Sequence, residues 1–286
     1  MRALTRLGLV AASAATVAAV VLVWQDRSHD RGPLTSADIS RSASTAEIEQ
    51  AAGLRVFFAH QSVGGNIVAG LPGAYEAFGV PAPPVVELTG TSSLPPGLEG
   101  ARGGFFTHLV IGENGDPLGK IRDFDARIRS GLGDRIDVAF LKLCYIDLTA
   151  ATDVDEVFEA YRTTFDALER DFPEVAFVAV TTPLTTEPAW RTRVKGLLGG
   201  SNPAPADNVA RQRFNALLRS AYGERVFDVA AHESTAPDGS RVSGTSDGEE
   251  YFALYDGYAL DEGHLDRITS EVVAARLLGF LARRVG

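Results

Sequence analysis

Strand-like and helix-like segments alternate along most of this chain, and this alternation limits the possible folds more than any other feature. Apolar runs of strand length occur at 54–59, 84–89, 137–143, 175–181 and 225–230, with helical patterns between them. Strands and helices that alternate at this spacing build a parallel sheet with helices on both faces. We therefore expect an α/β fold, a three-layer doubly wound structure around a five-stranded parallel sheet.

The helical segments carry apolar residues at three- and four-residue steps, most clearly over 153–172. Asp116 followed by Pro117 predicts a second helix start, because aspartate caps a helix and proline suits its first position. A third helix is expected over 269–284, and residues 44–47 (STAE) have the form of a capping box ahead of the first strand.

A serine and a late Asp-x-x-His pair give the chain a candidate nucleophile and a candidate base. Ser62 follows the strand at 54–59, where two glycines at 64–65 let the backbone turn sharply into a helix. A serine hydroxyl needs a neighbouring base, and the base needs an acceptor on its second ring nitrogen. Asp261 and His264, on one turn before the last helix, can supply both.

The expected fold brings these residues to one edge. In doubly wound sheets ligands bind beyond the carboxyl ends of the strands, where the strand order reverses. For the flavodoxin-like order 2-1-3-4-5 that point lies between the first and third strands, which Ser62 and residues 142–147 follow. The long segment 231–260 would deliver the Asp-x-x-His pair there, and with 185–207 it would wall the cleft. A serine that only caps its helix and an Asp-His pair at the surface are the alternatives.

These motifs, in this order, resemble the SGNH (GDSL-like) hydrolase family over residues 54–284. In that family the nucleophilic serine follows the first strand and the Asp-x-x-His lies just before the last helix. Here HQSVGGN (60–66) stands in place of the Gly-Asp-Ser box, and together with KLCY it resembles an atypical branch. The resemblance implies Ser62 as nucleophile and oxyanion donor, His264 as base and Asp261 as the residue that orients the base.

Two further boxes of the family supply hydrogen-bond donors to the oxyanion. Residues 105–120 look like the second box, in which Gly115 is the best match. The third box usually carries an asparagine, but this chain has KLCYID at 142–147. Three side chains could replace the asparagine, and the sequence does not choose among Tyr145, Cys144 and Lys142.

Five polar residues near these boxes are candidates for lining the substrate pocket: His60, Asn66, Asn114, Lys142 and Cys144. His60 could instead brace the turn, and Cys144 could be a buried inert thiol. His232 and Glu233 could be grouped with the Asp-x-x-His pair as a metal cluster, but their spacing matches no dedicated motif. We therefore expect neither a metal nor another cofactor.

Composition narrows the choice of partners. The 286 residues are 45% hydrophobic, enough to bury one large core. A net charge of −10 argues against nucleic acid, and against an anionic membrane surface as the main partner. The expected partner is a small-molecule or glycan ester substrate, with no obligate protein partner.

An apolar segment precedes the expected domain. Residues 7–24 form an uninterrupted apolar run at the lower length limit for crossing a bilayer, so 1–24 is typical of a signal anchor or signal peptide, and we favour the anchor. Residues 25–43 are polar and without periodicity, which indicates a flexible tether, and 44–286 form the hydrolase domain. This organisation predicts export, with the membrane-anchored protein facing the periplasm or cell exterior, or secretion if the segment is cleaved.

The sequence thus predicts an SGNH-type serine esterase that works through an acyl-enzyme, on a cell-envelope or extracellular glycan ester or on a lipid. One alternative is an α/β-hydrolase, since HQSVG is similar to the G-x-S-x-G elbow, although His60 replaces its first glycine and the elbow follows the first strand. The other is a membrane-tethered binding module without turnover, which the missing asparagine of the third box keeps open.

Overall fold

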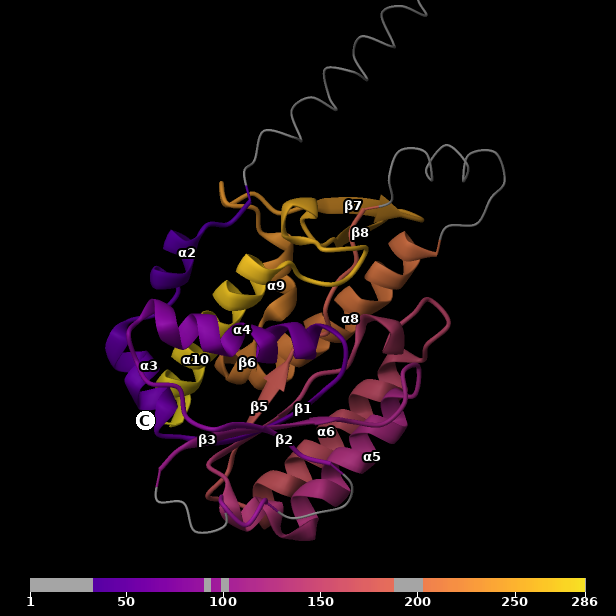
Figure 1. Cartoon of the computed structure of the whole chain (residues 1–286). Coiled ribbons are helices and arrows are strands. Elements are labelled where there is room, and N and C mark those ends of the chain that lie inside the picture. The colour runs from indigo at the N-terminus through magenta and orange to yellow at the C-terminus, as the bar shows by residue number, and fades with distance from the viewer. Residues whose placement is uncertain (1–32, 90–93, 99–102, 188–202, 286) are drawn as a thin grey trace, which may run out of the picture. The chain divides into compact units, whose positions relative to one another are not determined.

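The computed structural model describes residues 33–89, 94–98, 103–187 and 203–285. Its central sheet has six parallel strands in the order β2-β3-β1-β4-β5-β6. The strands are β1 (Arg55–His60), β2 (Val85–Glu87), β3 (Phe105–Val110), β4 (Val138–Leu141), β5 (Ala176–Val180) and β6 (Val226–Phe227). Helices cover both faces of the sheet, which confirms the predicted three-layer α/β fold (Figure 1).

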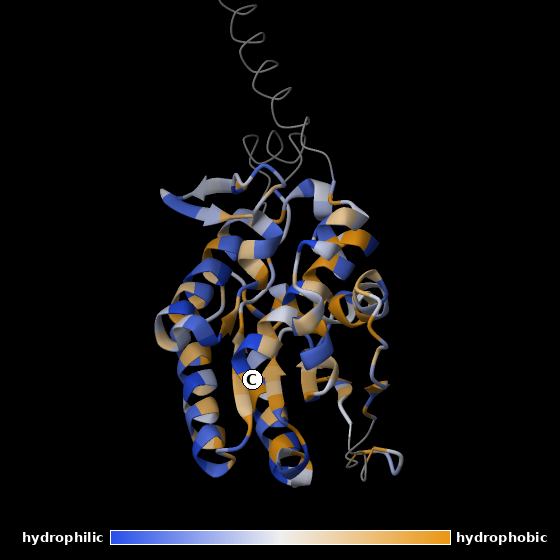
Figure 2. Ribbon diagram, turned by 90° about the vertical axis from the view of Figure 1, so that its left-hand side faces the viewer, coloured by the Kyte–Doolittle hydropathy of each residue, from blue (hydrophilic) through white to orange (hydrophobic). Residues whose placement is uncertain are grey.

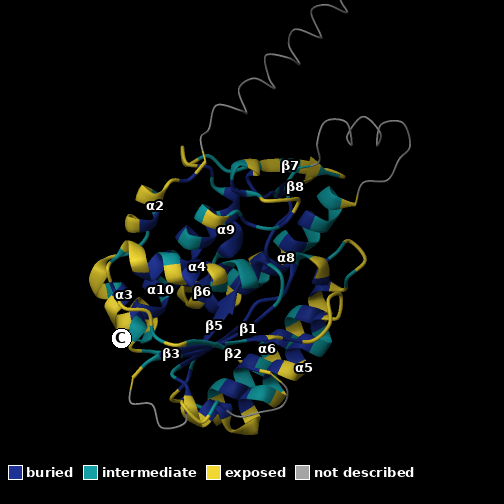
Figure 3. Ribbon diagram, viewed as in Figure 1, coloured by how far each residue is buried: buried dark blue, intermediate teal, exposed yellow. Residues whose placement is uncertain are grey.

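Two apolar cores lie on opposite faces of the sheet. One is formed with α3 (Thr45–Ala52), α4 (Val63–Ala77) and α10 (Arg267–Val285), the other with α5 (Pro117–Arg127), α6 (Val154–Asp171) and α8 (Ala204–Tyr222). Successive strand residues point to opposite faces, so Phe58 belongs to the first core and Phe57 to the second. The apolar strands run between helices whose outer faces are hydrophilic (Figure 2), and the sheet is buried at the centre (Figure 3).

Short helical turns connect several of these elements. They are η1 (Ile128–Leu132), η2 (Gly133–Arg135), η3 (Tyr145–Asp147), η4 (Gly223–Arg225) and η5 (Asp256–Tyr258). Of these, η3 follows β4 after residues 142–144 and holds the second half of the segment 142–147, which the sequence predicts as the third box.

The local signals for helix starts are confirmed. The Asp116 side chain accepts a hydrogen bond from the Gly119 amide at 2.8 Å and caps α5. Ser44 and Glu47 form the expected capping box at α3, where each side chain accepts from the other residue's amide. Such bonds satisfy amides that the first helical turn leaves without partners, which is why these residue types mark the starts so well.

The prediction of five strands in the order 2-1-3-4-5 is wrong by one strand. Residues 105–120 are predicted as the second box, but their first part forms β3, which lies between β2 and β1. Two polar residues interrupt the apolar run there. Thr107 is buried, and its hydroxyl donates to the Val56 carbonyl at 2.8 Å, so the core tolerates it. The added strand leaves β1 beside β4, as expected.

The segment 231–260 is not the long loop that we expected. It contains most of α9 (Val229–Ser234) and a hairpin of β7 (Ser243–Ser246) and β8 (Glu249–Phe252). The hairpin turns at Asp247 and Gly248, whose φ angles of 51° and 86° are both positive. Asp-Gly between two strands is a strong signal for such a two-residue turn.

The prediction of a flexible tether over 25–43 is wrong for the second half of this segment. Within it, α2 (Ser36–Ser40) forms a helix that contacts α10 and α4, and Leu34 and Ile39 are buried in the core. Five residues are too short a stretch to show a helical period, so composition alone suggested a tether. The apolar run 7–24 lies outside the described residues. No helix among the residues that are described is long and apolar enough to cross a membrane.

Helices α4 and α10 touch closely enough to require a glycine. A Cβ atom on Gly70 would lie 2.3 Å from the Ser270 carbonyl oxygen, so only glycine allows this approach. Ser62 directly precedes α4 and His264 lies three residues before α10. The contact between these two helices therefore helps to fix the distance between the two side chains.

Candidate active site

Ser62 sits at a sharp turn between β1 and α4. Its φ of 52° is positive, which is unusual for any residue except glycine and is a strained conformation. Although Ser62 occupies the N-cap position of α4, its side chain caps no amide of that helix. The structure thus excludes the alternative in which Ser62 only caps the helix. The hydroxyl is free to face the carboxyl edge of the sheet.

Ser62, His264 and Asp261 form a continuous hydrogen-bonded series. The Ser62 Oγ lies 2.7 Å from Nε2 of His264, and Nδ1 of His264 lies 2.9 and 2.8 Å from the two carboxylate oxygens of Asp261. Because Asp261 can only accept when ionised, Nδ1 carries the proton and Nε2 is left to accept from the serine hydroxyl. This is the tautomer that lets a histidine remove a proton from serine.

The turn that carries Asp261 is built around its carboxylate. Oδ1 of Asp261 accepts hydrogen bonds from the amides of Gly263 and His264, both at 2.9 Å. These two bonds, followed by the bond from the His264 ring, lower the pKa of Asp261 below its usual value. Asp261 is ionised at neutral pH, which its exposure to water also favours, since its side chain is 55% exposed.

Tyr145 is the third-box residue that lies beside the proposed base. Its ring is edge-on to the His264 ring with centroids 6.0 Å apart, and its hydroxyl has the Ser62 side chain as a neighbour. Burial, and then the Asp261 charge, raise the pKa of Tyr145 above 10.0, so the hydroxyl stays protonated and can donate. The turn 261–264, called the base turn below, packs against the Tyr145 ring, because a Cβ on Gly263 would lie 2.6 Å from this ring.

Gly115, the expected donor of the second box, already has an acceptor. Its amide donates to Oδ1 of Asp147 at 2.9 Å, and the same buried carboxylate binds Lys120 Nζ at 2.7 Å and the Cys144 amide at 2.6 Å. Asp147 therefore joins the second box to η3. A role of Gly115 toward an oxyanion would require its amide to leave this carboxylate.

The five candidates for lining the pocket take different places. Lys142 and Cys144 are fully buried, with Nζ and Sγ 3.7 Å apart, and His60 is 2% exposed, so we correct the prediction that these three line the pocket. His60 ends the apolar strand β1, and Lys142 and Cys144 follow the apolar strand β4. Their side chains therefore lie buried beneath the site. Asn66 accepts a long hydrogen bond of 3.4 Å from the Leu265 amide. Asn114 is exposed and accepts from Lys120.

His60 braces the turn from below. Its Nε2 lies 3.1 Å from Nδ1 of His108, and a Cβ on Gly64 would lie 2.3 Å from the His60 Cβ, so α4 starts directly against this residue. Burial, followed by the charge of Lys142 and the neighbouring His108, lowers the pKa of His60 to about 3. A neutral buried ring of this kind suits a support rather than a general base at neutral pH.

A row of polar residues on α8, which no sequence motif indicates, holds the loop after β5. Asn215 pairs with the backbone of Thr182, accepting from its amide at 2.7 Å and donating to its carbonyl at 2.9 Å. Asn208 pairs in the same way with Thr185, at 3.1 and 3.0 Å. Each side-chain amide thus gives the backbone of this loop the hydrogen bonds that a neighbouring strand would provide within the sheet.

The proposed cluster of His232 and Glu233 with the Asp-x-x-His pair does not form. The His232 ring bonds Arg276 at 3.2 Å, and the buried Glu233 carboxylate accepts from the Leu184 amide at 3.0 Å. In the part of the chain that the structure describes, no group of three His, Cys, Asp or Glu side chains is placed to hold a metal ion.

Comparison with known proteins gives only distant likenesses. The chain matches no protein-family model and no curated protein. A Streptococcus pneumonia protein provisionally described as a platelet activating factor is 14% identical, with a TM-score of 0.44 over 92% of this chain and 97% of that chain. The periplasmic domain of a lipopolysaccharide acetyltransferase from Salmonella ser. Paratyphi A is 13% identical, with a TM-score of 0.42 over 86% and 89%.

A third solved structure, from Desulfitobacterium hafniense and provisionally described as a lipolytic protein of the G-D-S-L family, is 12% identical. Its TM-score is 0.33 over 80% of this chain and 98% of that chain. The case for the site therefore rests on its own geometry.

Proposed function

We propose that this protein is a serine hydrolase of the SGNH type that cleaves an ester through an acyl-enzyme. The observation that carries the proposal is the series Ser62–His264–Asp261, with 2.7 Å between the serine oxygen and Nε2. A strained turn that presents the serine, and a base whose tautomer is fixed by a carboxylate, are what nucleophilic catalysis by serine requires.

The reaction follows from these positions. The Ser62 oxygen attacks the ester carbonyl while His264 takes the hydroxyl proton at Nε2. The ion pair with Asp261 stabilises the imidazolium that forms. His264 then returns the proton to the departing alcohol, which leaves an acyl group on Ser62. A water molecule, deprotonated by the same ring, releases the acid and restores the serine.

Stabilisation of the oxyanion is assigned to the backbone amide of Ser62 and to the hydroxyl of Tyr145. Tyr145 takes the place of the asparagine that the third box lacks. The support for this role is the place of Tyr145, whose ring lies edge-on to the His264 ring and whose hydroxyl has the Ser62 side chain as a neighbour, together with a raised pKa that keeps its proton available. A donor that is fixed in place before the reaction is typically worth about 10² or more in kcat.

The substrate class and the location complete the proposal. An enzyme of this type that is exported, with 7–24 as a membrane anchor, would meet acyl groups on cell-envelope or extracellular glycans. The apolar run is the support for export. Mass spectrometry of the native protein tests the anchor, since a mature N-terminus near residue 15 or 25 would mean cleavage and release.

The experiment that tests the catalytic role is covalent labelling with a fluorophosphonate probe. We expect the wild type to be labelled and Ser62→Ala to be unlabelled, since the probe reacts with activated serines. Ser130→Ala, which removes an exposed serine from η1, is the matched control and should be labelled like the wild type. If Ser62→Ala were labelled as strongly as the wild type, the assignment of Ser62 as the nucleophile would be contradicted. If the wild type were neither labelled nor able to hydrolyse esters, a binding module would be favoured.

A further inference from the structure

Arg211, which no motif singled out, lies between the two halves of the proposed site. It belongs to α8, one turn after Asn208, and is only 3% exposed. Its Nε donates to the Tyr145 carbonyl at 2.8 Å, and its guanidinium carbon lies 5.6 Å from the centre of the Tyr145 ring. The same side chain thus holds both the backbone and the ring of Tyr145, whose ring lies edge-on to the ring of the proposed base His264.

The other end of the guanidinium holds the loop after β5. Nη1 of Arg211 donates to the Thr185 hydroxyl at 3.0 Å and to the Asn208 side-chain oxygen at 2.7 Å. Asn208 in turn pairs with the backbone of Thr185. Arg211 therefore ties Tyr145 to this loop through one rigid planar group.

The loop after β5 also supports the turn that carries the base. The Thr186 amide donates to the Glu262 carbonyl at 2.9 Å, and Glu262 stands next to Asp261. The Leu254 amide donates to the Thr185 carbonyl at 3.1 Å, which joins the chain leading into the base turn to the same loop. A continuous series of hydrogen bonds thus runs from Tyr145 through Arg211 to the residues that flank the base.

We propose that Arg211 is a positioning residue, which sets Tyr145 and the Asp261–His264 turn in register with Ser62. This inference rests on the proposed serine hydrolase function. Arg211 does not touch the reacting atoms, so its effect must pass through Tyr145 and the base turn. A lysine at this place keeps the charge but loses the fork of donors that reaches two segments at once.

The test is a double-mutant cycle on ester hydrolysis with Arg211→Lys, Tyr145→Phe and the double variant, using p-nitrophenyl acetate. We expect Arg211→Lys to lower kcat by about 10- to 100-fold, the scale of a small displacement at a reacting centre, with KM changed less than about threefold. In the Tyr145→Phe protein the hydroxyl is already absent, so the same lysine should lower kcat less, by only the part of the loss that passes through the base turn. Loss of stability alone would instead act equally in both backgrounds.

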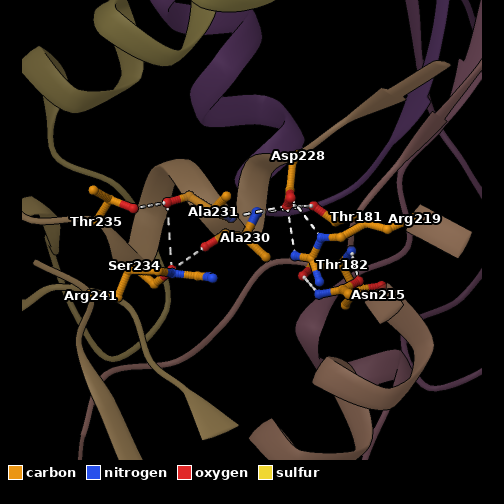
Figure 4. A network of polar contacts seen from close by, with 10 residues as sticks. All are labelled: Thr181, Thr182, Asn215, Arg219, Asp228, Ala230, Ala231, Ser234, Thr235 and Arg241. Carbon is orange, nitrogen blue, oxygen red and sulfur yellow. Dashed lines mark hydrogen bonds and ion pairs between the residues drawn. The ribbon is translucent and has the colours of Figure 1, made fainter. Parts of the chain in front are cut away.

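Arg219→Lys is the matched control on the same helix. Arg219 donates to Asp228 at 2.6 and 2.8 Å, in the network drawn in Figure 4, where Asn215 and Thr182 also pair. We expect this control to keep the wild-type kcat. If Arg211→Lys does not fold, Thr185→Val, which removes one acceptor of the guanidinium, takes its place in the cycle with a smaller expected loss.

Two results would overturn the positioning role. One is an equal loss of kcat from Arg211→Lys with and without the Tyr145 hydroxyl, and the other is a loss in Arg219→Lys as large as in Arg211→Lys. Failure of the proposed function is a separate result, since the wild type would then neither hydrolyse the ester nor react with the serine probe.

Discussion

Replacing the buried His60 with glutamine should destabilise the protein less at pH 5 than at pH 7. Burial, and then the charge of Lys142 and the neighbouring His108, lower the pKa of His60 from 6.5 to about 3. In the unfolded chain the ring titrates near its ordinary value. Because the unfolded state then binds a proton that the folded state refuses, His60 contributes stability above pH 6.5 that is lost as the pH falls toward 3.

The size of the effect follows from that pKa shift. Between pH 7 and pH 5, an unfolded-state pKa of 6.5 and a folded-state pKa of about 3 remove about 2 kcal/mol of unfolding free energy through this residue. The His60→Gln protein lacks the titrating group, so the cost of the substitution should shrink by the same amount over this range. Glu233, whose pKa burial raises to about 8, acts in the opposite direction, but it is present in both proteins and cancels.

The measurement is urea unfolding of the wild type and His60→Gln at the two pH values, followed by far-ultraviolet circular dichroism. Phe58→Leu is the control, because the Phe58 ring lies 4.7 Å from the His60 ring in the same core and carries no titratable group. The loss of unfolding free energy caused by Phe58→Leu should be the same at both pH values. If the cost of His60→Gln is also unchanged with pH, the ring is not held neutral by burial and the reasoning fails.

Three further predictions concern the site and its supports. Gly70→Ala should cost about 1–3 kcal/mol and lower kcat, because the added methyl group drives α10 from α4, whereas Gly65→Ala, with open space around its Cβ, should cost nothing in denaturant unfolding. Asp261→Asn should lower kcat by about 10³- to 10⁴-fold with the fold intact, and full activity would reject Asp261 as the residue that orients the base. A chain that begins at Ser44 should unfold at lower urea concentration than one that begins at Leu34, since it lacks two buried side chains worth about 1.5–3 kcal/mol each; equal midpoints would show that α2 adds no stability.

The sequence predicted those features whose signals are local. Helix starts at Asp116 and Ser44 depend on bonds between residues three apart, so a few letters carry the whole signal. The hydrogen bonds between Asp261 and His264 are likewise contained in one turn. The order of strands and helices then placed Ser62 at the same edge, although the two parts are 202 residues apart.

Features that depend on distant partners could not be predicted in this way. Asn208, Arg211 and Asn215 recur at helical spacing, a pattern that usually marks a solvated helix face. They are buried because a backbone segment outside the sheet lies beside them, which only the tertiary structure reveals. The strand β3 was missed for a related reason. Its Thr107 is polar, yet the strand beside it supplies the acceptor.

The two halves of the proposed catalytic series are held in different ways. Ser62 follows the buried strand β1, and its turn is braced from below by His60, so its position is fixed by the core. Asp261 is 55% exposed and Glu262 is exposed as well. This part of the turn is joined to the loop after β5 by the hydrogen bond from the Thr186 amide to the Glu262 carbonyl, whereas the following Gly263 and Leu265 are buried. Segments with few buried contacts open at lower free energy than the core. Changes at Arg211 or Thr186 should therefore reach catalysis before they reach global stability, because they loosen the base while the nucleophile stays in place.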